Sequence, residues 1–81
     1  MIRGIYTIRD EASATYMALQ LNENNDVAIR NFDYAMANNE MMRFSPTDFS
    51  LWYIGDYDDE TGLIEAKNPL KLKVGVKRGR K

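Results

Sequence analysis

The chain has 81 residues, which is enough for one small domain with a core that is small relative to its surface. It contains no cysteine and no histidine, which excludes disulfides and thiolate or imidazole metal sites, so we expect no metal and no cofactor. The net charge of −1 conceals two unlike parts: residues 1–66 carry four basic and twelve acidic residues, whereas residues 67–81 carry seven basic residues and no acid.

The length and polarity of the chain also indicate whether it self-associates and where in the cell it is found. A domain of this size without disulfides or metals often gains burial by self-association, so we expect a homo-oligomer, a dimer or larger. Every apolar run is much shorter than the roughly 18 residues of a membrane span. Charges interrupt the N-terminal stretch MIRGIYTIRDE, which is unlike a secretory signal. We therefore expect a soluble cytoplasmic protein without membrane contact.

The first third of the chain predicts two strands. Residues 2–9 alternate in polarity as a strand does, and residues 10–14 are typical of a turn. Residues 15–21 predict a second strand with weaker alternation, and a short helix fits that stretch as well. The first strand places Arg3, Ile5 and Arg9 on one of its faces.

A helix follows the polar stretch NENND, residues 22–26, whose Asn and Asp side chains suit a helix N-cap. It is predicted to run to about Ala37. Asn38 and Asn39 are expected to end it, since Asn tolerates the left-handed conformation of a C-terminal cap. Apolar residues recur at helical spacing on one stripe: Ala28, Ile29, Phe32, Ala35 and Met36.

The remaining elements complete a β-β-α-β-β order. Residues 40–48 form a connection, residues 49–57 a third strand, residues 58–62 a turn and residues 63–66 a fourth strand. This order predicts an α+β fold, a small antiparallel sheet with one helix packed on one face. We expect residues 1–66 to form this single domain.

The last fifteen residues, 67–81, predict a basic tail that is partly disordered. Within it, LKLKVGV (residues 70–76) also fits a short edge strand whose lysines discourage further pairing. The tail favours contact with phosphates, although a solubilising extension, or a link to the acidic parts of neighbouring subunits, fits the same charges.

The acidic stretch DYDDETG, residues 56–62, allows three interpretations. A calcium loop of the EF-hand type requires glycine at its sixth position and glutamate at its twelfth, where this chain has Thr61 and Lys67. Catalytic carboxylates need a partly buried concave site, and the usual nucleophile and base pairs are missing. A hairpin turn closed by Gly62 is favoured, so we expect no enzymatic activity.

The strand before this turn has two apolar faces. Trp52 and Ile54 lie on the face opposite the one that the helix is expected to cover, and an uncovered Trp and Ile usually indicate an interface. We therefore predict an oligomer interface of Ile5, Trp52 and Ile54, or else a flat surface for a nucleotide base. Packing inside the core or between subunits fits Trp52 too. The face toward the helix carries Phe49, Leu51, Tyr53 and Tyr57.

The stretch TDFSLWYIGDYDDETG resembles a pattern in the small non-structural protein of gokushoviruses, which belong to the microvirus group of single-stranded DNA bacteriophages. The YTIRD strand and the NDVAIRNFDYAMAN helix are similar to that family as well, with matches at Ala28, Arg30 and Phe32, so the resemblance covers residues 5–66. The main pattern is matched by Pro46, Asp48, Phe49, Leu51, Gly55, Asp56, Tyr57, Asp58, Thr61 and Gly62.

The resemblance implies a DNA-binding protein that is made in the cytoplasm of the infected bacterium and is absent from the virion. It also implies a role in genome replication, in the switch to single-stranded genome synthesis, or in packaging. It implies no catalytic residue.

From the residues, we predict binding of single-stranded DNA without strong sequence preference, confined to the tail and one face of the sheet because the rest of the chain is acidic. An alternative is a protein-interaction module that redirects a host or phage replication protein by strand addition. The predicted DNA-binding residues are Arg3, Arg9, Trp52, Lys71, Lys73, Lys77, Arg78, Arg80 and Lys81.

Overall fold

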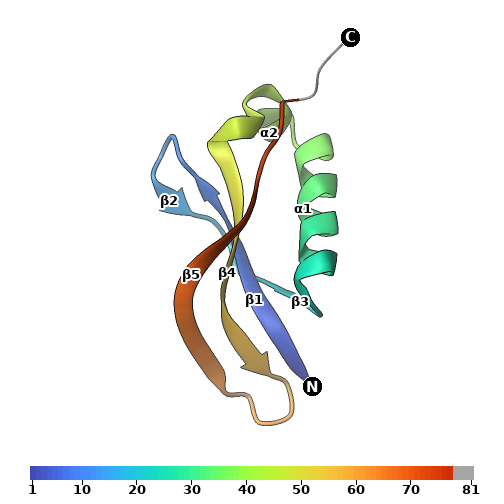
Figure 1. Ribbon diagram of the computed structural model, residues 1–81, viewed down its shortest axis with the longest axis vertical. Helices are drawn as coiled ribbons and strands as arrows, with labels where there is room; N and C mark the ends of the chain where they lie inside the picture. Colours follow the sequence, from blue (N-terminus) through green and yellow to red (C-terminus); the bar gives the residue numbers. More distant parts are fainter. Residues whose placement is uncertain (78–81) are drawn as a thin grey trace.

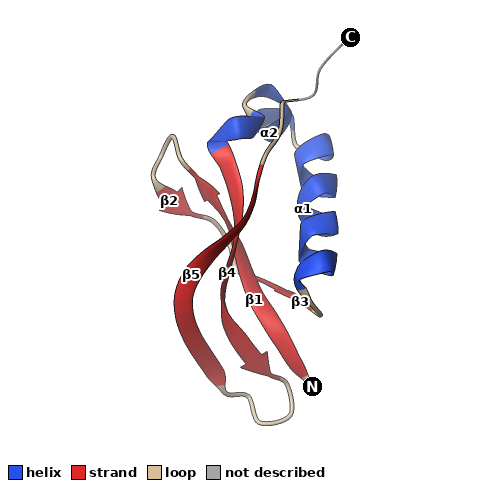
Figure 2. Cartoon of the chain, viewed as in Figure 1, coloured by secondary structure: helices blue, strands red, loops and turns tan. Residues whose placement is uncertain are grey.

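An antiparallel sheet with one main helix against one of its faces makes up the computed structural model, which describes residues 1–77 (Figure 1). Figure 2 shows the helices gathered along one side and at one end of the sheet. The predicted α+β class is confirmed. The elements are β1 (Ile2–Asp10), β2 (Thr15–Tyr16), β3 (Gln20–Asn22), α1 (Asn25–Asn38), α2 (Glu40–Phe44), the 3-10 turn η1 (Pro46–Asp48), β4 (Phe49–Asp58) and β5 (Ile64–Val74).

The strands are ordered β2-β1-β4-β5, and β3 pairs with β1 on the same side as β2. The single second strand expected at 15–21 is therefore split in two. Between the two pieces, the Thr7 hydroxyl donates to the carbonyl oxygen of Met17 over 2.9 Å. Two residues of β1 lie between the partners of Tyr16 and Gln20, whereas three residues, 17–19, lie between Tyr16 and Gln20 themselves, so an extra residue interrupts the strand.

Asparagine residues lie at both ends of α1. The Asn24 side chain accepts a hydrogen bond from the Val27 amide over 2.9 Å, which satisfies one of the free amides of the first turn. Asn39 ends the helix, but its φ of −99° is extended rather than left-handed as predicted. It acts instead as the N-cap of α2, where its side chain accepts from the Met42 amide.

The core lies between α1 and the sheet. Phe32 of α1 is 2 % exposed and packs with residues of both central strands, including Leu51 at 4 %. Burying a side chain of this kind contributes about 1.5–3 kcal/mol. The predicted helix stripe and the predicted facing of Phe49, Leu51 and Tyr53 are confirmed. The buried cluster is Tyr6, Ile8, Ala28, Phe32, Met42, Phe49 and Leu51.

A bulge at Ile54 changes the facing of the second half of β4. Ile5 of β1 lies opposite Gly55 while Tyr6 lies opposite Tyr53, so Ile54 is an extra residue in β4. One inserted residue reverses the side of every residue after it. Tyr57 therefore pairs with Arg3 on the face away from α1, and its predicted place beside Phe49 was wrong.

Strand β5 is longer than predicted. The fourth strand was expected to end at residue 66, but β5 continues to Val74 because it pairs with β4 along most of its length. Leu72 packs against the core. Residues 67–74 are therefore part of the sheet rather than of a tail, and the alternative of an edge strand within LKLKVGV is the correct one. The basic residues at 78–81 lie outside the described part of the chain.

Candidate nucleic-acid interface

A row of two aromatic rings with a cation at each end crosses the sheet face that is turned away from α1. The Arg9 guanidinium carbon lies 4.9 Å from the centroid of the Tyr16 ring. The Tyr16 ring meets the Trp52 ring edge to face, with centroids 5.8 Å apart. The Lys71 Nζ atom lies 5.4 Å from the centroid of the Trp52 ring. We call these four residues the aromatic–cation row.

Strand register brings the row together. Each of the four strands β1, β2, β4 and β5 contributes one residue. Arg9 lies opposite Tyr16, and Trp52 lies opposite Lys71. Residues directly opposite in an antiparallel pair project from the same face, so both pairs lie on one side of the sheet. Tyr6 and Ile8 point toward α1, and Thr7 between them pairs with Trp52 on the other face.

Polar contacts hold two of the four side chains of the row, Trp52 and Arg9. The indole N–H of Trp52 donates to the Ser50 hydroxyl over 2.8 Å. The Arg9 Nε donates to a Glu11 carboxylate oxygen over 3.0 Å, and this bond, with a smaller contribution from Tyr16, raises the pKa of Arg9 above its ordinary value. The polar edge of the indole is thus occupied inside the chain, and the ring presents mainly its apolar surface.

The predicted DNA-binding residues divide into separate groups. Arg9, Trp52 and Lys71 are brought together in the aromatic–cation row. Arg3 lies near the other end of β1, where its Nε donates to Asp59 over 3.2 Å. Lys73 lies opposite Leu51 on the face of the sheet toward α1, where its Nζ is 2.8 Å from Asp33.

The basic residues after β5 do not join the row either. Lys77 is exposed and lines a groove beside α2. The other three predicted residues, Arg78, Arg80 and Lys81, lie outside the described residues.

The predicted oligomer interface is not one surface. Ile5 is only 6 % exposed and pairs with Leu21 on one side and Gly55 on the other, so it is buried within the chain. The expectation that Ile5 faces a partner is therefore wrong. Ile54 occupies the bulge and Trp52 belongs to the row, and both are partly exposed.

Sequence comparison places the chain among phage proteins. A family model described as Phage ORF5 protein matches residues 3–77, which include every described strand and helix apart from Ile2. The chain belongs to the Phage ORF5 protein family. Comparison with curated proteins and with solved structures found no match.

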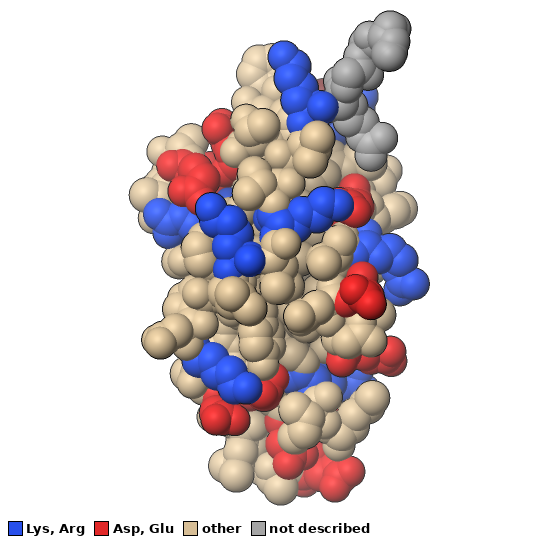
Figure 3. All heavy atoms as spheres, in the orientation of Figure 1, with Lys and Arg blue, Asp and Glu red and all other residues tan. Residues whose placement is uncertain are grey.

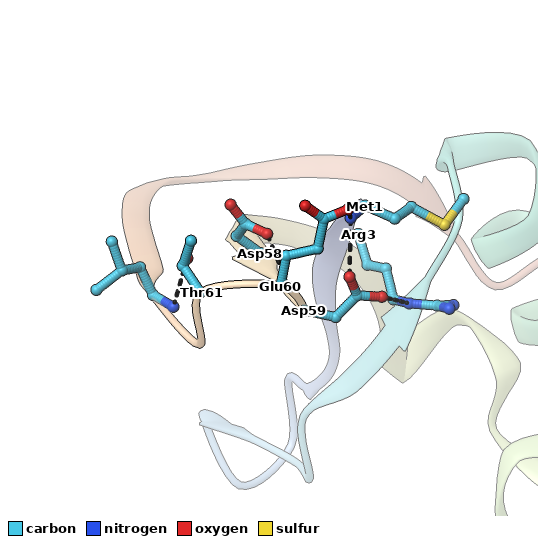
Figure 4. A network of polar contacts seen from close by, with 7 residues as sticks. Met1, Arg3, Asp58, Asp59, Glu60 and Thr61 are labelled. Atoms are coloured by element: carbon cyan, nitrogen blue, oxygen red, sulfur yellow. Dashed lines mark hydrogen bonds and ion pairs between the residues drawn. The ribbon is translucent and has the colours of Figure 1, made fainter.

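Three of the acids that suggested chemistry, Asp58, Asp59 and Glu60, lie at the turn of this phage ORF5 protein (Figure 4). The Asp58 carboxylate accepts from the Glu60 amide over 2.9 Å, and Gly62 has a φ of +78°, as the predicted hairpin requires. The Asp59 carboxylate binds Arg3 and the N-terminal amine, and the bond from that amine is the main reason why the pKa of Asp59 is lowered.

The sequence patterns of the phage ORF5 protein did not reveal the place of two residues, one on each face of the sheet. Tyr16 was read only as part of a weakly alternating stretch, but the short connection at 11–14 sets it opposite Arg9. That connection contains Ala14 at a φ of +57°, a conformation unusual for alanine. Lys67 was placed in the tail, although its Nζ lies 2.9 Å from Asp56 on the face toward α1.

Within residues 1–77, no helix has the length and apolar character needed to cross a bilayer.

Proposed function

We propose that this phage protein binds single-stranded DNA without strong sequence preference, and that the aromatic–cation row contacts the strand. The observation that carries the proposal is the pair of contacting rings flanked by two cations, with one residue from each of four strands: Arg9, Tyr16, Trp52 and Lys71. Unpaired bases stack on aromatic rings, and the basic side chains that flank the two rings would meet the phosphates. Stacking contributes about 1–3 kcal/mol per base and tolerates any base.

The occupied polar edge of Trp52 supports the absence of sequence preference. Its N–H already donates to Ser50, so the ring offers stacking surface rather than a donor that distinguishes one base from another. Lys71 adds a charge without a fixed geometry, since an ammonium group binds phosphate as a point charge. The proposed mode is therefore stacking combined with phosphate attraction.

The biological setting of the proposal comes from the family. Membership of the Phage ORF5 protein family supports a role during phage infection. The resemblance to gokushovirus non-structural proteins supports the finer proposal of a protein in the cytoplasm of the infected bacterium, absent from the virion. There it would support genome replication, or the switch to single-stranded genome synthesis and packaging. We propose a homo-oligomer that binds DNA and has no enzymatic activity of its own.

Intrinsic fluorescence provides the test, because Trp52 is the only tryptophan in the chain. Titration with an oligothymidine is expected to quench it. Lys71→Gln and Lys73→Gln form a matched pair, with the same change of charge two residues apart on opposite faces. We expect Lys71→Gln to weaken binding several-fold. It should also make the slope of log affinity against log salt concentration (the salt slope) less steep by about 0.7, whereas Lys73→Gln should change neither quantity. Equal effects of the two variants would contradict binding on this face.

A chain ending at Lys77 separates the row from the basic residues that follow. This truncation removes Arg78, Arg80 and Lys81 and leaves β5 intact. Each lost phosphate contact would reduce the salt slope by about 0.7. Equal binding by the two forms assigns the contact to the row alone, and absence of binding by both forms at low salt rejects the proposal.

A second candidate is a protein-interaction module that redirects a host or phage replication protein. The observation that favours it is the outer edge of β5, which pairs only with β4 among the described strands. Such an edge can accept an extended peptide as a further strand. This function would be favoured over the first by two results together: the protein pulls down replication proteins from infected cells, and oligothymidine does not quench its Trp52 fluorescence.

A further inference from the structure

The two ends of the molecule differ in shape and charge. The molecule measures 48 Å along its longest axis and only 23 × 17 Å across. Figure 1 places α2 at one end of this axis and the turn between β4 and β5 at the other. In Figure 3, acidic side chains gather at the end with the turn, and basic side chains lie at the end with α2.

The end with α2 carries a groove of about 660 Å³ with both apolar and polar lining, between the end of α1, α2, η1 and the residues after β5. Phe44 at its rim is 85 % exposed, and Val76 is 68 % exposed. Met36 and Met42 also line it, and methionine adapts readily to the shape of an apolar partner.

Gly75 allows the residues after β5 to form one wall of this groove. A Cβ atom at Gly75 would lie 2.0 Å from the Pro46 carbonyl oxygen, so only glycine fits. Its amide donates to the Phe49 carbonyl over 2.8 Å and fixes the segment there. Arg43 and Lys77 add two positive charges to the groove and Asp48 one negative charge.

The opposite end has complementary features. Leu63 and Ile64 follow the turn and are 71 % and 68 % exposed. Asp58, Asp59 and Glu60 precede them in the turn. The N-terminal amine and Arg3 compensate part of this charge.

We propose that copies of this protein associate head to tail, with Leu63 and Ile64 of one copy seated in the groove of the next. The acids of the turn then approach Arg43 and Lys77, and the exposed Phe44 ring is covered. Like ends carry like charge, which disfavours pairing of two grooves or of two turns. Because the groove and the turn lie at opposite ends of the long axis, an interface between these unlike ends adds copies along that axis and continues as an open chain (Figure 1).

This interface is separate from the aromatic–cation row, and the proposal goes beyond DNA binding. Neither end includes Arg9, Tyr16, Trp52 or Lys71. Copies joined end to end would leave every row accessible to one strand. Binding to long single-stranded DNA would then be cooperative, because each copy would gain a protein neighbour as well as a DNA contact.

Two variants and their mixture test the proposal by sedimentation velocity without DNA. Phe44→Glu blocks the groove and leaves the turn intact, whereas Leu63→Lys blocks the turn and leaves the groove intact. We expect the wild-type chain to form concentration-dependent assemblies, and each variant alone to associate at least about tenfold more weakly. Mixed in equal amounts, the two variants are expected to form a dimer and nothing larger, because only one pair of intact ends remains.

Tyr34→Glu is the control, since Tyr34 is a 72 % exposed aromatic on α1 that neither lines the groove nor belongs to the turn, and its substitution should leave assembly unchanged. Circular dichroism confirms that each variant is folded. A wild-type chain that stays monomeric at millimolar concentration, or a mixture that stays monomeric, overturns the proposal. Trp52 quenching measured on the monomeric variants reports DNA binding separately, so failure of assembly and failure of DNA binding are distinguished.

Discussion

The two faces of the sheet use the same residue types for different purposes. On the face toward α1, Lys67 lies 5.7 Å from the Tyr53 ring centroid, and both residues contact Asp56. On the opposite face, Lys71 lies at a similar distance, 5.4 Å, from Trp52. The first lysine is neutralised within a small network of charged and hydroxyl groups, and its pKa is raised well above the ordinary value, chiefly by Asp56.

The difference shows that a cation beside an aromatic ring does not by itself indicate a binding site. What distinguishes the outer face is an extended row that spans four strands and ends in Lys71. Stability should therefore depend mainly on the face toward α1, and DNA binding mainly on the other. The predictions below test this division, from the largest expected effect to the smallest.

Truncating the core at Phe32 should cause the largest loss of stability. Phe32→Ala leaves a cavity between α1 and the sheet, and we expect the free energy of unfolding to fall by about 3–5 kcal/mol. Urea denaturation followed by circular dichroism measures this. A loss below about 1 kcal/mol would mean that α1 is not what stabilises the sheet.

Shortening Trp52 in the row should reduce DNA affinity more than it reduces stability, the reverse of what is expected at Phe32. Trp52→Ala is expected to weaken binding of a labelled oligothymidine by about 1–3 kcal/mol, measured by fluorescence anisotropy. Its cost in unfolding free energy should be smaller than that of Phe32→Ala, because Trp52 is only partly buried. Tyr34→Ala, an exposed aromatic on α1, is the control and should bind as the wild type does.

Removing the acid beside the row should strengthen binding. Glu11 holds Arg9 and places a negative charge beside the proposed path of the phosphates. We expect Glu11→Gln to raise DNA affinity about two- to fivefold at low salt, an effect that diminishes as salt screens the charge. Glu23→Gln removes an exposed acid elsewhere and should have little effect. Weaker binding by Glu11→Gln would show that its orientation of Arg9 outweighs its charge.

The smallest effect on stability is expected from protonation of Asp56, which lies on the face toward α1. The Tyr53 hydroxyl, and then Lys67, lower the pKa of Asp56 below its ordinary value of 3.8. The ionised carboxylate of Asp56 therefore stabilises the fold at pH values above the ordinary pKa, and this stabilisation is lost as the pH falls through the lowered pKa. Asp56→Asn should flatten the decline of unfolding free energy between about pH 5 and pH 2, by at most about 1 kcal/mol because the pair is partly exposed. An unchanged decline would assign it to other acids.

Local patterns predicted much of the fold. The stripe around Phe32 and the capping residues near Asn24 indicated α1, because helix periodicity and capping depend on residues a few positions apart. Gly62 indicated the turn for the same reason. Three members of the candidate site, Arg9, Trp52 and Lys71, were predicted from charge and exposure without any knowledge of their contacts.

The residues whose predicted positions were wrong are positioned by pairing between strands that are far apart in the sequence. Tyr57 changed face because of the bulge at Ile54, which arises where β4 pairs with both β1 and β5. Ile5 proved buried because Leu21 and Gly55 flank it from distant parts of the chain. Alternation along one strand contains no information about either event.

The sequence by itself determined the main helix, the long strands before and after it, the N-terminal cap of α1, the turn at Gly62 and the contrast in charge between the two parts of the chain. All of these depend on composition or on near neighbours. Only the tertiary structure decided that residues 67–74 extend β5 and that Tyr16, Arg9, Trp52 and Lys71 form one row. The physical reason is that strand register and bulges are set by hydrogen bonding and packing between segments far apart in the sequence.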